Sequence, residues 1–409
     1  MPRSAQRTSK LTSSWSFRVN HPVDVKAEVE GISAHRPPAE RIALPLWGVI
    51  AAVSLYVIGF YWDISWHQTI GRDSFLNPAH VAIYLCGIVG GISCAYLIFS
   101  TTFGRNQAAK AASVAVWGFR APLGAFVVAW GGVLMLTSAP FDNWWHNAYG
   151  LDAKLNSPPH WVLTSGVFAV QMGGMILVAG ARNRASEQIR QRLTWLLLYL
   201  GATFIALPLV LPNNRVLQHS AIFYLAICAT APVVLVGIAN ATGRAWACTT
   251  IAAIYTSYVL AFLWVLPLFP GSPRLAPVYQ NVTRFVPPSF PILIIVPAIF
   301  LDYFRSHRRF QNQWVDSAIA GIIFLVTLVA AQWPFADLLM SSYARNWIFG
   351  AHRMPYFTPP SAHLATNHFN YVEKTRPEFW AVMALALAVA VLGSRIGLAA
   401  GNWLRRVER

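Results

Sequence analysis

The stretch IALPLWGVIAAVSLYVIGFYW, residues 42–62, carries no charged side chain and is long enough to cross a lipid bilayer, which takes about 20 apolar residues. A second run of the same kind, HVAIYLCGIVGGISCAYLIF, follows at residues 80–99. Over the whole 409-residue chain 56% of the residues are hydrophobic and only 11% are charged, whereas soluble domains carry about 25% charged residues. We therefore predict an integral membrane protein that crosses the bilayer several times.

Similar apolar runs continue to the end of the chain and predict about ten spans. A segment that faces lipid must satisfy its own backbone hydrogen bonds, so we expect each span to be helical. The predicted fold class is an all-α polytopic transmembrane helical bundle. The expected spans are residues 42–62, 79–101, 119–140, 159–181, 191–211, 217–241, 246–269, 288–305, 315–336 and 377–399.

The net charge of +16 follows the predicted topology. Basic residues follow every even-numbered span and fill the N-terminal tail, which fits the positive-inside rule with both termini in the cytoplasm. This distribution argues against nucleic acid as a partner and leaves anionic membrane lipids as a possible one. Residues 1–40 lack the apolar core of a cleaved signal peptide, so we expect a cytoplasmic tail of an inner-membrane protein.

A polar stretch, YWDISWHQTIGRDSFLNPAHVAIY at residues 61–84, joins the first two spans. Asp63 and His67 are four residues apart and share one helix face if the first helix continues one turn past its apolar run. Asn77 is a good N-cap and Pro78 suits the first helical position, so His80 is expected in the first turn of the returning helix. The hairpin would thus bring one carboxylate and two imidazoles together.

The same pattern recurs between spans three and four, in APFDNWWHNAYGLDAKLNSPPHWVL at residues 139–163. Asp142 and His146 repeat the four-residue spacing, and Ser157-Pro158 precedes His160 as Asn77-Pro78 precedes His80. Two consecutive hairpins with one signature indicate an internal duplication. Two imidazoles and a carboxylate suit Cu(II), Fe(II) or Zn(II), with coordination positions left open.

A single histidine near a membrane boundary is more often structural than metal-binding, and the repetition is what favours metal. The tryptophans beside these histidines, Trp66 and Trp145, are more readily explained as an aromatic belt at the membrane interface. Groups that hydrogen-bond a ligating imidazole usually stand just outside the ligand set, and three residues suit that role. These are Arg72, Asp73 and Asp152.

The first motif as a whole reads Asp63-x-x-Trp66-His67, then Arg72-Asp73, Phe75, Pro78, His80 and Tyr84. This pattern resembles the signature of the C-type subunit of the copper membrane monooxygenases, the family of particulate methane, ammonia and hydrocarbon monooxygenases. The resemblance covers residues 40–185 and is looser in the second hairpin, where Asp142 stands in place of the family's Asn and Leu151 in place of an Arg72 counterpart.

The resemblance implies copper at two neighbouring sites, one set being Asp63, His67 and His80 and the other Asp142, His146 and His160. It also implies O₂-dependent hydroxylation of a small apolar substrate or ammonia by a complex with other membrane subunits. The chain has no flavin, nicotinamide, haem or iron–sulfur motif, so electrons would come from an external donor such as quinol. A homo-oligomer is an alternative assembly, and iron or zinc an alternative metal.

A non-enzymatic copper-binding, assembly or structural subunit remains the main alternative function. The chain is expected to comprise the tail of residues 1–40, a two-hairpin metal-binding region at 41–185, and further transmembrane helices at 186–409. The last part includes a long outer loop at 338–376, which holds His352, His363 and His368 and suggests a cap over the metal sites or a docking surface. His219 is a further loose candidate ligand.

Overall fold

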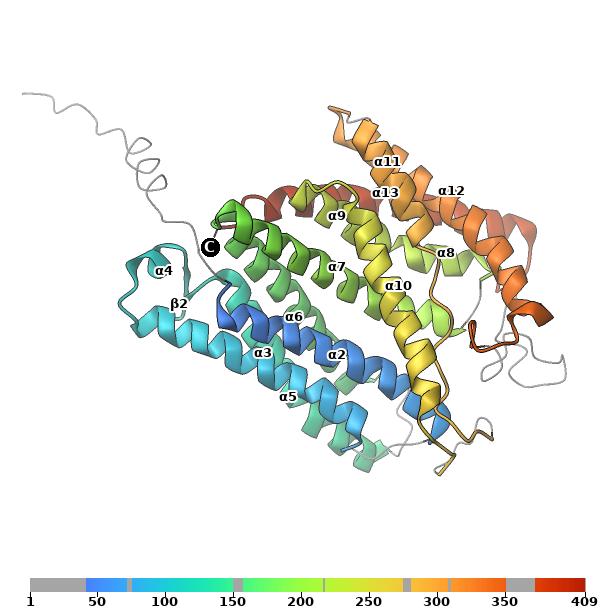
Figure 1. The fold of residues 1–409 in the computed structure, drawn as a ribbon, viewed down its shortest axis with the longest axis horizontal. Coiled ribbons are helices and arrows are strands. Elements are labelled where there is room, and N and C mark those ends of the chain that lie inside the picture. The colour runs from blue at the N-terminus through green and yellow to red at the C-terminus, as the bar shows by residue number, and fades with distance from the viewer. Residues whose placement is uncertain are drawn as a thin grey trace, which may run out of the picture. The chain divides into compact units, whose positions relative to one another are not determined.

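The computed structural model describes residues 42–71, 76–149, 157–215, 218–274, 281–307, 310–350 and 372–408. The predicted N-terminal tail and three histidines of the long loop, His352, His363 and His368, lie outside this part of the chain. Within it, nine helices are long and apolar enough to cross a membrane. The predicted all-α polytopic bundle is therefore confirmed, and the protein is a multi-pass membrane protein (Figure 1).

The chain passes up and down through the bundle in long helices. The connections on one face are short, apart from one small two-stranded antiparallel sheet between α3 and α5. The elements are α2 Leu44–Thr69, α3 Pro78–Phe103, α4 Gln107–Ala111, β1 Val114–Val116, β2 Phe119–Ala121, α5 Leu123–Tyr149, α6 Pro158–Asn183, α7 Glu187–Arg215, α8 Ala221–Cys228, α9 Ala231–Thr242, α10 Ala247–Val265, η1 Leu266–Leu268, α11 Ile295–His307, α12 Gln313–Met340, η2 Ser342–Ala344 and α13 Arg376–Leu404.

The eighth predicted span, residues 288–305, is not a continuous helix. Residues 285–294 contain no helix, and α11 begins only at Ile295 and has 13 residues, about 20 Å of helix. The sequence explains this, because Pro287, Pro288 and Pro291 lack backbone N–H groups and fix φ, and each disfavours helical geometry in the residue before it. Hydropathy predicted a span here, and the structure has instead a non-helical stretch followed by the short helix α11.

Non-helical backbone inside a membrane protein needs hydrogen-bond partners from neighbouring elements. Here polar side chains on α2, α7 and α12 provide them, which explains why these apolar helices bury serine, threonine, asparagine and glutamine. The bonds run from Ser65 Oγ to Val286 O (2.5 Å), from Val286 N to Thr69 Oγ1 (2.9 Å), from Asn213 Nδ2 to Phe290 O (3.0 Å) and from Leu293 N to Gln332 Oε1 (2.8 Å).

The eighth segment nevertheless runs the length of α10. At one end the Phe285 N–H donates to Phe269 O, just past the end of α10. At the other end the Asp302 carboxylate accepts the backbone N–H groups of Cys248 and Thr249 in the first turn of α10. The described chain thus has nine span-length helices and this mixed segment beside α10. At one end of the bundle, Asn183 Nδ2 in the last turn of α6 donates to Leu404 O at the end of α13.

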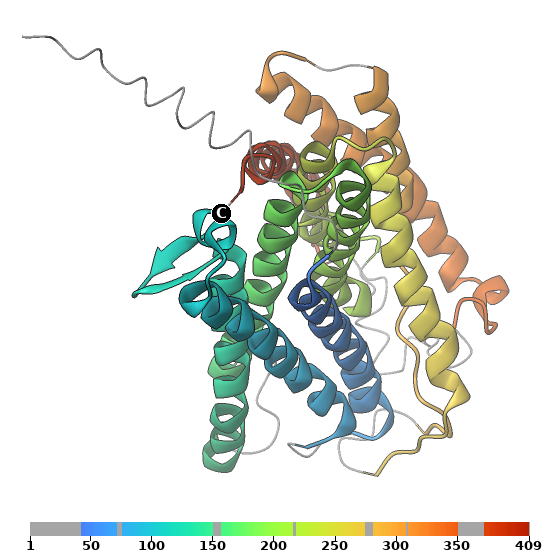
Figure 2. The ribbon, with the colours of Figure 1, turned by 60° about the vertical axis from the view of Figure 1, so that its left-hand side comes forward.

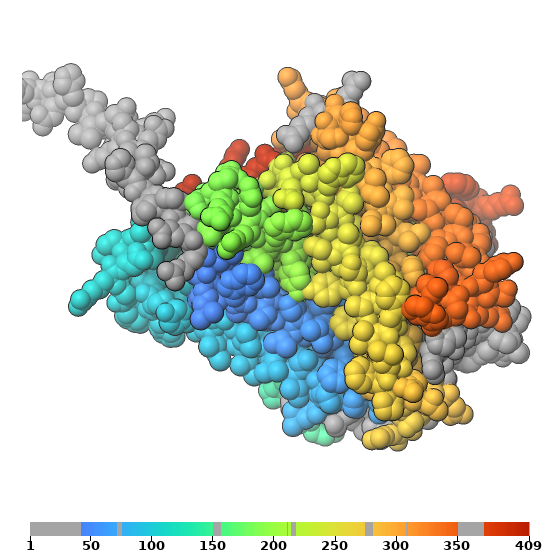
Figure 3. Space-filling view, in the orientation of Figure 1, coloured from blue at the N-terminus to red at the C-terminus, as the bar shows by residue number. Residues whose placement is uncertain are grey.

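The half of the bundle that carries the two predicted hairpins packs through close helix contacts. A Cβ atom on Gly131 of α5 would lie 2.7 Å from the backbone oxygen of Gly166 on α6, so only glycine permits this approach. Beside the first hairpin, the surface of α10 adjoins that of α2 (Figure 3). Tyr61 and Phe262 stack between these helices, with ring centroids 4.9 Å apart. Figure 2 shows α2, α3 and α5 as neighbouring helices of this half.

Candidate metal centre

The first hairpin forms as the sequence predicts. Helix α2 does not stop at the end of its apolar run but continues to Thr69, so Asp63 and His67 lie one turn apart on the same helix. Helix α3 begins at Pro78, and the side chain of Asn77 caps it by accepting the backbone N–H of His80 at 2.6 Å. The cap fixes His80 in the first turn of α3, opposite the end of α2.

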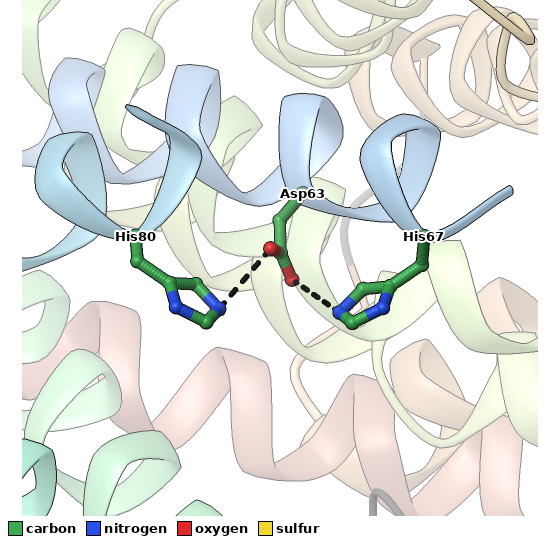
Figure 4. Close-up of side chains that lie close together, drawn as sticks. All are labelled: Asp63, His67 and His80. Carbon is green, nitrogen blue, oxygen red and sulfur yellow. Dashed lines mark ion pairs between the residues drawn. The ribbon is translucent and has the colours of Figure 1, made fainter. Parts of the chain in front are cut away.

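These three side chains converge (Figure 4). The Asp63 carboxylate lies between the two imidazoles, with Oδ2 3.6 Å from His67 Nε2 and Oδ1 3.2 Å from His80 Nε2. One ligand atom from each residue lies within 4.8 Å of the other two. The two helices of this hairpin, α2 and α3, thus present a carboxylate oxygen and two ring nitrogens to one small volume.

The environment of Asp63 fits a bound cation. Its side chain is only 17% exposed, and its Oδ1 is buried without a hydrogen-bond donor among the described residues. The nearby His80 nitrogen is within ion-pair distance but does not have hydrogen-bond geometry toward that oxygen. A buried carboxylate oxygen without a donor is costly, on the order of 1–3 kcal/mol or more, and a metal ion would relieve this cost. The donor set of one carboxylate and two imidazoles suits a divalent transition metal.

The second hairpin repeats the arrangement less tightly. Asp142 and His146 lie one turn apart on α5, with His146 Nε2 3.4 Å from Asp142 Oδ2. His160, in the first turn of α6, brings Nδ1 to 4.0 Å from Asp142 Oδ1. Asp142 Oδ1 is also buried without a donor among the described residues. Within the described chain, only the first hairpin brings three ligand atoms as close as 4.8 Å.

One difference between the two hairpins lies in the capping residue. Ser157 occupies the position of Asn77, but its side chain makes no cap bond to the helix backbone. Instead its hydroxyl lies 2.6 Å from Nδ1 of His160. The motif places Ser157 at the position of Asn77, but it does not show that the hydroxyl would contact the imidazole and not the helix backbone.

The two hairpins pack against one another through their helices. The contacts between α3 and α5 and between α2 and α6 bring the hairpins together. The duplicated motif therefore produces two neighbouring acid–imidazole clusters at one end of the bundle.

Other candidates from the sequence fall elsewhere. Arg72, Asp73 and Asp152 lie outside the described residues. His219 is buried against the Trp333 ring and pairs with Asp337 on α12, Nε2 to Oδ1 3.1 Å. Asp337 was not singled out in the sequence, because a lone carboxylate at a helix end carries no motif.

No known protein family, curated protein or solved structure matches the chain. The similarity to the copper membrane monooxygenases therefore depends on the motif residues of the first hairpin. The convergence of Asp63, His67 and His80 is an independent observation, because it depends only on the geometry of α2 and α3.

Proposed function

We propose that the chain is a copper-binding subunit of a membrane monooxygenase, with its main metal site at Asp63, His67 and His80. The single observation that supports this is the set of three ligand atoms within 4.8 Å of one another, contributed by both arms of a membrane hairpin. The second set, Asp142, His146 and His160, holds a second ion with a looser ligand arrangement.

Each residue has a distinct part in this proposal. The Asp63 carboxylate contributes the negative charge that offsets a divalent cation, and the His67 and His80 imidazoles contribute neutral nitrogen ligands. The Asn77 cap holds His80 against α2 before metal arrives, which reduces the ordering that binding requires. Bound copper would supply a redox-active centre with open coordination positions.

The proposed reaction is hydroxylation of a small apolar substrate or of ammonia. One atom of O₂ enters the product and the other leaves as water, and this balance requires two electrons and two protons. A quinol in the membrane carries both, and the chain contains no motif for a redox cofactor of its own. Partner subunits would complete the enzyme. Under the positive-inside rule the basic face is cytoplasmic, which places the metal centre on the periplasmic side of the inner membrane.

A non-enzymatic copper-binding or assembly subunit is the second candidate function, and one observation favours it. The His67 side chain is 47% exposed, so one ligand of the site is open to the exterior. An exposed ligand allows a metal to exchange with a carrier, which storage or delivery requires. Iron and zinc remain alternative metals for the same donor set.

Metal analysis of purified protein tests the binding proposal. We expect one tightly bound copper per chain that is lost in Asp63→Asn and His67→Ala, and whose Cu(II) electron paramagnetic resonance spectrum shows two nitrogen ligands. His307→Ala is the matched control, because His307 lies at the end of α11 outside both hairpins. Wild-type protein without bound redox metal would exclude the proposal. O₂-dependent product formation with a quinol donor then separates the enzyme from the carrier.

A further inference from the structure

The connection between α3 and α5 carries a cluster of exposed aromatic side chains. Strands β1 and β2 form a hairpin with a two-residue turn, residues 114–121, which we call the aromatic hairpin. Trp117 at its tip is 80% exposed and Phe119 is 37% exposed. Trp117 stacks edge-to-face on Trp130 of α5 (centroids 5.6 Å apart), and Phe119 packs in the same way against Phe99 of α3 (5.8 Å).

The backbone of the tip is unusual for its sequence. Trp117 and Gly118 both have positive φ, 47° and 83°, as a tight hairpin turn with this twist requires. Asn-Gly or Asp-Gly is the usual pair there, and a bulky residue at positive φ is strained. A tryptophan at this position therefore indicates a role for the exposed indole that outweighs the strain.

The aromatic hairpin is fixed to the end of α3. The Arg120 N–H donates to Thr102 Oγ1 (2.8 Å), and the same hydroxyl lies 3.2 Å from Arg120 O. The position of the tip along the bundle follows from its ring contacts. Trp130 is seven residues into α5, so its partner Trp117 lies about 10 Å along that span from its start. The hairpin thus folds back beside the membrane helices, and Figure 2 shows it projecting sideways from them.

The charges around the hairpin have one sign. The sequence from Phe75 to Phe141 contains no aspartate or glutamate, whereas Arg105, Lys110 and Arg120 lie in the connection between α3 and α5. Arg105 and Arg120 are exposed. Aromatic rings at the end of membrane helices, together with basic groups and no acids, match the interface and the anionic headgroups of a bilayer.

We propose that the aromatic hairpin is a lipid-binding wedge. Its Trp117 and Phe119 rings insert between lipid headgroups at the level of the first turns of α5, and Arg105, Lys110 and Arg120 bind anionic phospholipid phosphates. The wedge sets the depth of α3 and α5, the two helices that connect it to the metal-binding hairpins. This role does not depend on the identity of any bound metal.

Two observations favour lipid over a protein partner at this surface. The exposed aromatic side chains continue directly into the outward faces of α3 and α5, where Ile92 is 66% exposed and Val133 is 47% exposed. Helix α3 also has the smallest buried share of the nine span-length helices in the described chain. The hairpin therefore continues the surface that the bilayer solvates.

The depth of the tip can be measured with a spin label. The chain has four cysteines, all 0–1% exposed, so a cysteine placed at the tip should react selectively, and labelled wild type gives the background. Trp117→Cys protein carrying a nitroxide is reconstituted into phosphatidylcholine–phosphatidylglycerol vesicles. Collision rates with O₂, which concentrates in lipid, are compared with those of a water-soluble nickel chelate. Ile92→Cys provides the lipid reference and Gln188→Cys, exposed in the first turn of α7, the aqueous reference.

For each label we take the ratio of its collision rate with O₂ to its collision rate with the chelate. We expect this ratio to be at least threefold higher at Trp117 than at Gln188. Preferred collision with the chelate would place the tip in water and overturn the proposal. Low collision rates with both O₂ and the chelate would show that protein covers the tip, which would also overturn the proposal. If Trp117→Cys does not fold, Phe119→Cys gives the same measurement from the second strand.

The headgroup preference has its own test. A spin-labelled phosphatidylglycerol reports selectivity over phosphatidylcholine at the protein surface. The double variant Arg105→Gln with Arg120→Gln should lower that selectivity about two- to fivefold, because each cation near anionic lipid contributes modestly. Arg192→Gln, exposed on α7, serves as the control and should leave it nearly unchanged. Unchanged selectivity in the double variant would refute the anionic-lipid part of the proposal.

Discussion

The hydroxyl of Ser157 lies 2.6 Å from the Nδ1 atom of His160, and this contact distinguishes the second hairpin from the first. In the first hairpin the equivalent residue, Asn77, uses its side chain to accept the backbone N–H of His80 and leaves the imidazole directed at Asp63. The capping side chain therefore has a different partner in each hairpin, the helix backbone in the first and the imidazole in the second.

We accordingly expect Ser157→Asn to tighten metal binding by the second hairpin. Asparagine would cap α6 as Asn77 caps α3 and release Nδ1 of His160 toward Asp142. The expected gain is about threefold or more in affinity, measured by competitive metal titration in an Asp63→Asn background that disables the first site. A loss of affinity would show the opposite role, in which the Ser157 hydroxyl orients the His160 ring for metal binding. Removing such a hydrogen-bond partner of a ligand typically lowers metal affinity about 10–100-fold.

The cap of α3 should matter for both stability and metal binding. Asn77→Ala removes the acceptor of the His80 N–H, and loss of an N-cap costs about 1 kcal/mol of folding free energy. Because the same cap positions His80, copper affinity should fall together with the thermal midpoint. Asn106→Ala is the control, since Asn106 caps the short helix α4 through the Ala109 N–H, on the opposite face of the bundle. Equal copper affinity in the two variants would contradict the positioning role of Asn77.

Helix α2 connects the candidate metal centre to the extended segment at residues 285–294. Thr69 accepts the backbone N–H of Val286 at 2.9 Å, six residues beyond Asp63 on the same helix. Thr69→Val leaves that buried N–H without its acceptor, which should lower the free energy of unfolding by about 1–3 kcal/mol. Thr137→Val is the matched control, because the Thr137 hydroxyl bonds only within its own exposed helix turn. Destabilisation of equal size in both variants would argue against the extended segment as its source.

The convergence of Asp63, His67 and His80 was predictable from the sequence because its geometry is local. The four-residue spacing of Asp63 and His67 fixes their shared helix face, and Asn77-Pro78 fixes where α3 begins. Long membrane-spanning helices also follow from composition alone, since the bilayer requires long apolar runs, and the described chain has nine of them. These features need no knowledge of contacts between distant segments.

The features that the sequence did not predict depend on contacts between distant segments. The prolines of residues 287–291 prevent a helix, but the hydrogen bonds that make an extended crossing possible come from Ser65, Asn213 and Gln332 on three other helices. The predicted cap and candidate ligands lie close together in the sequence. The hydrogen-bond partners of the extended segment come from distant parts of the chain.

The convergence of Asp63, His67 and His80 also requires close approach of α2 and α3, and one glycine permits it. Gly59 lies one turn before Asp63, and a Cβ atom there would come within 2.9 Å of the backbone oxygen of Ala79 and 2.8 Å of Ile83 Cγ1. Gly59→Ala should therefore push the helices apart next to His80, lower the thermal midpoint and weaken copper binding by roughly tenfold. Gly91→Ala is the matched control on α3, because nothing lies within 4 Å of its Cβ position, and alanine is the better helix former there. Copper titration and thermal unfolding of both variants check the prediction. Tight copper binding in Gly59→Ala would mean that the position of His80 against Asp63 does not depend on this helix contact.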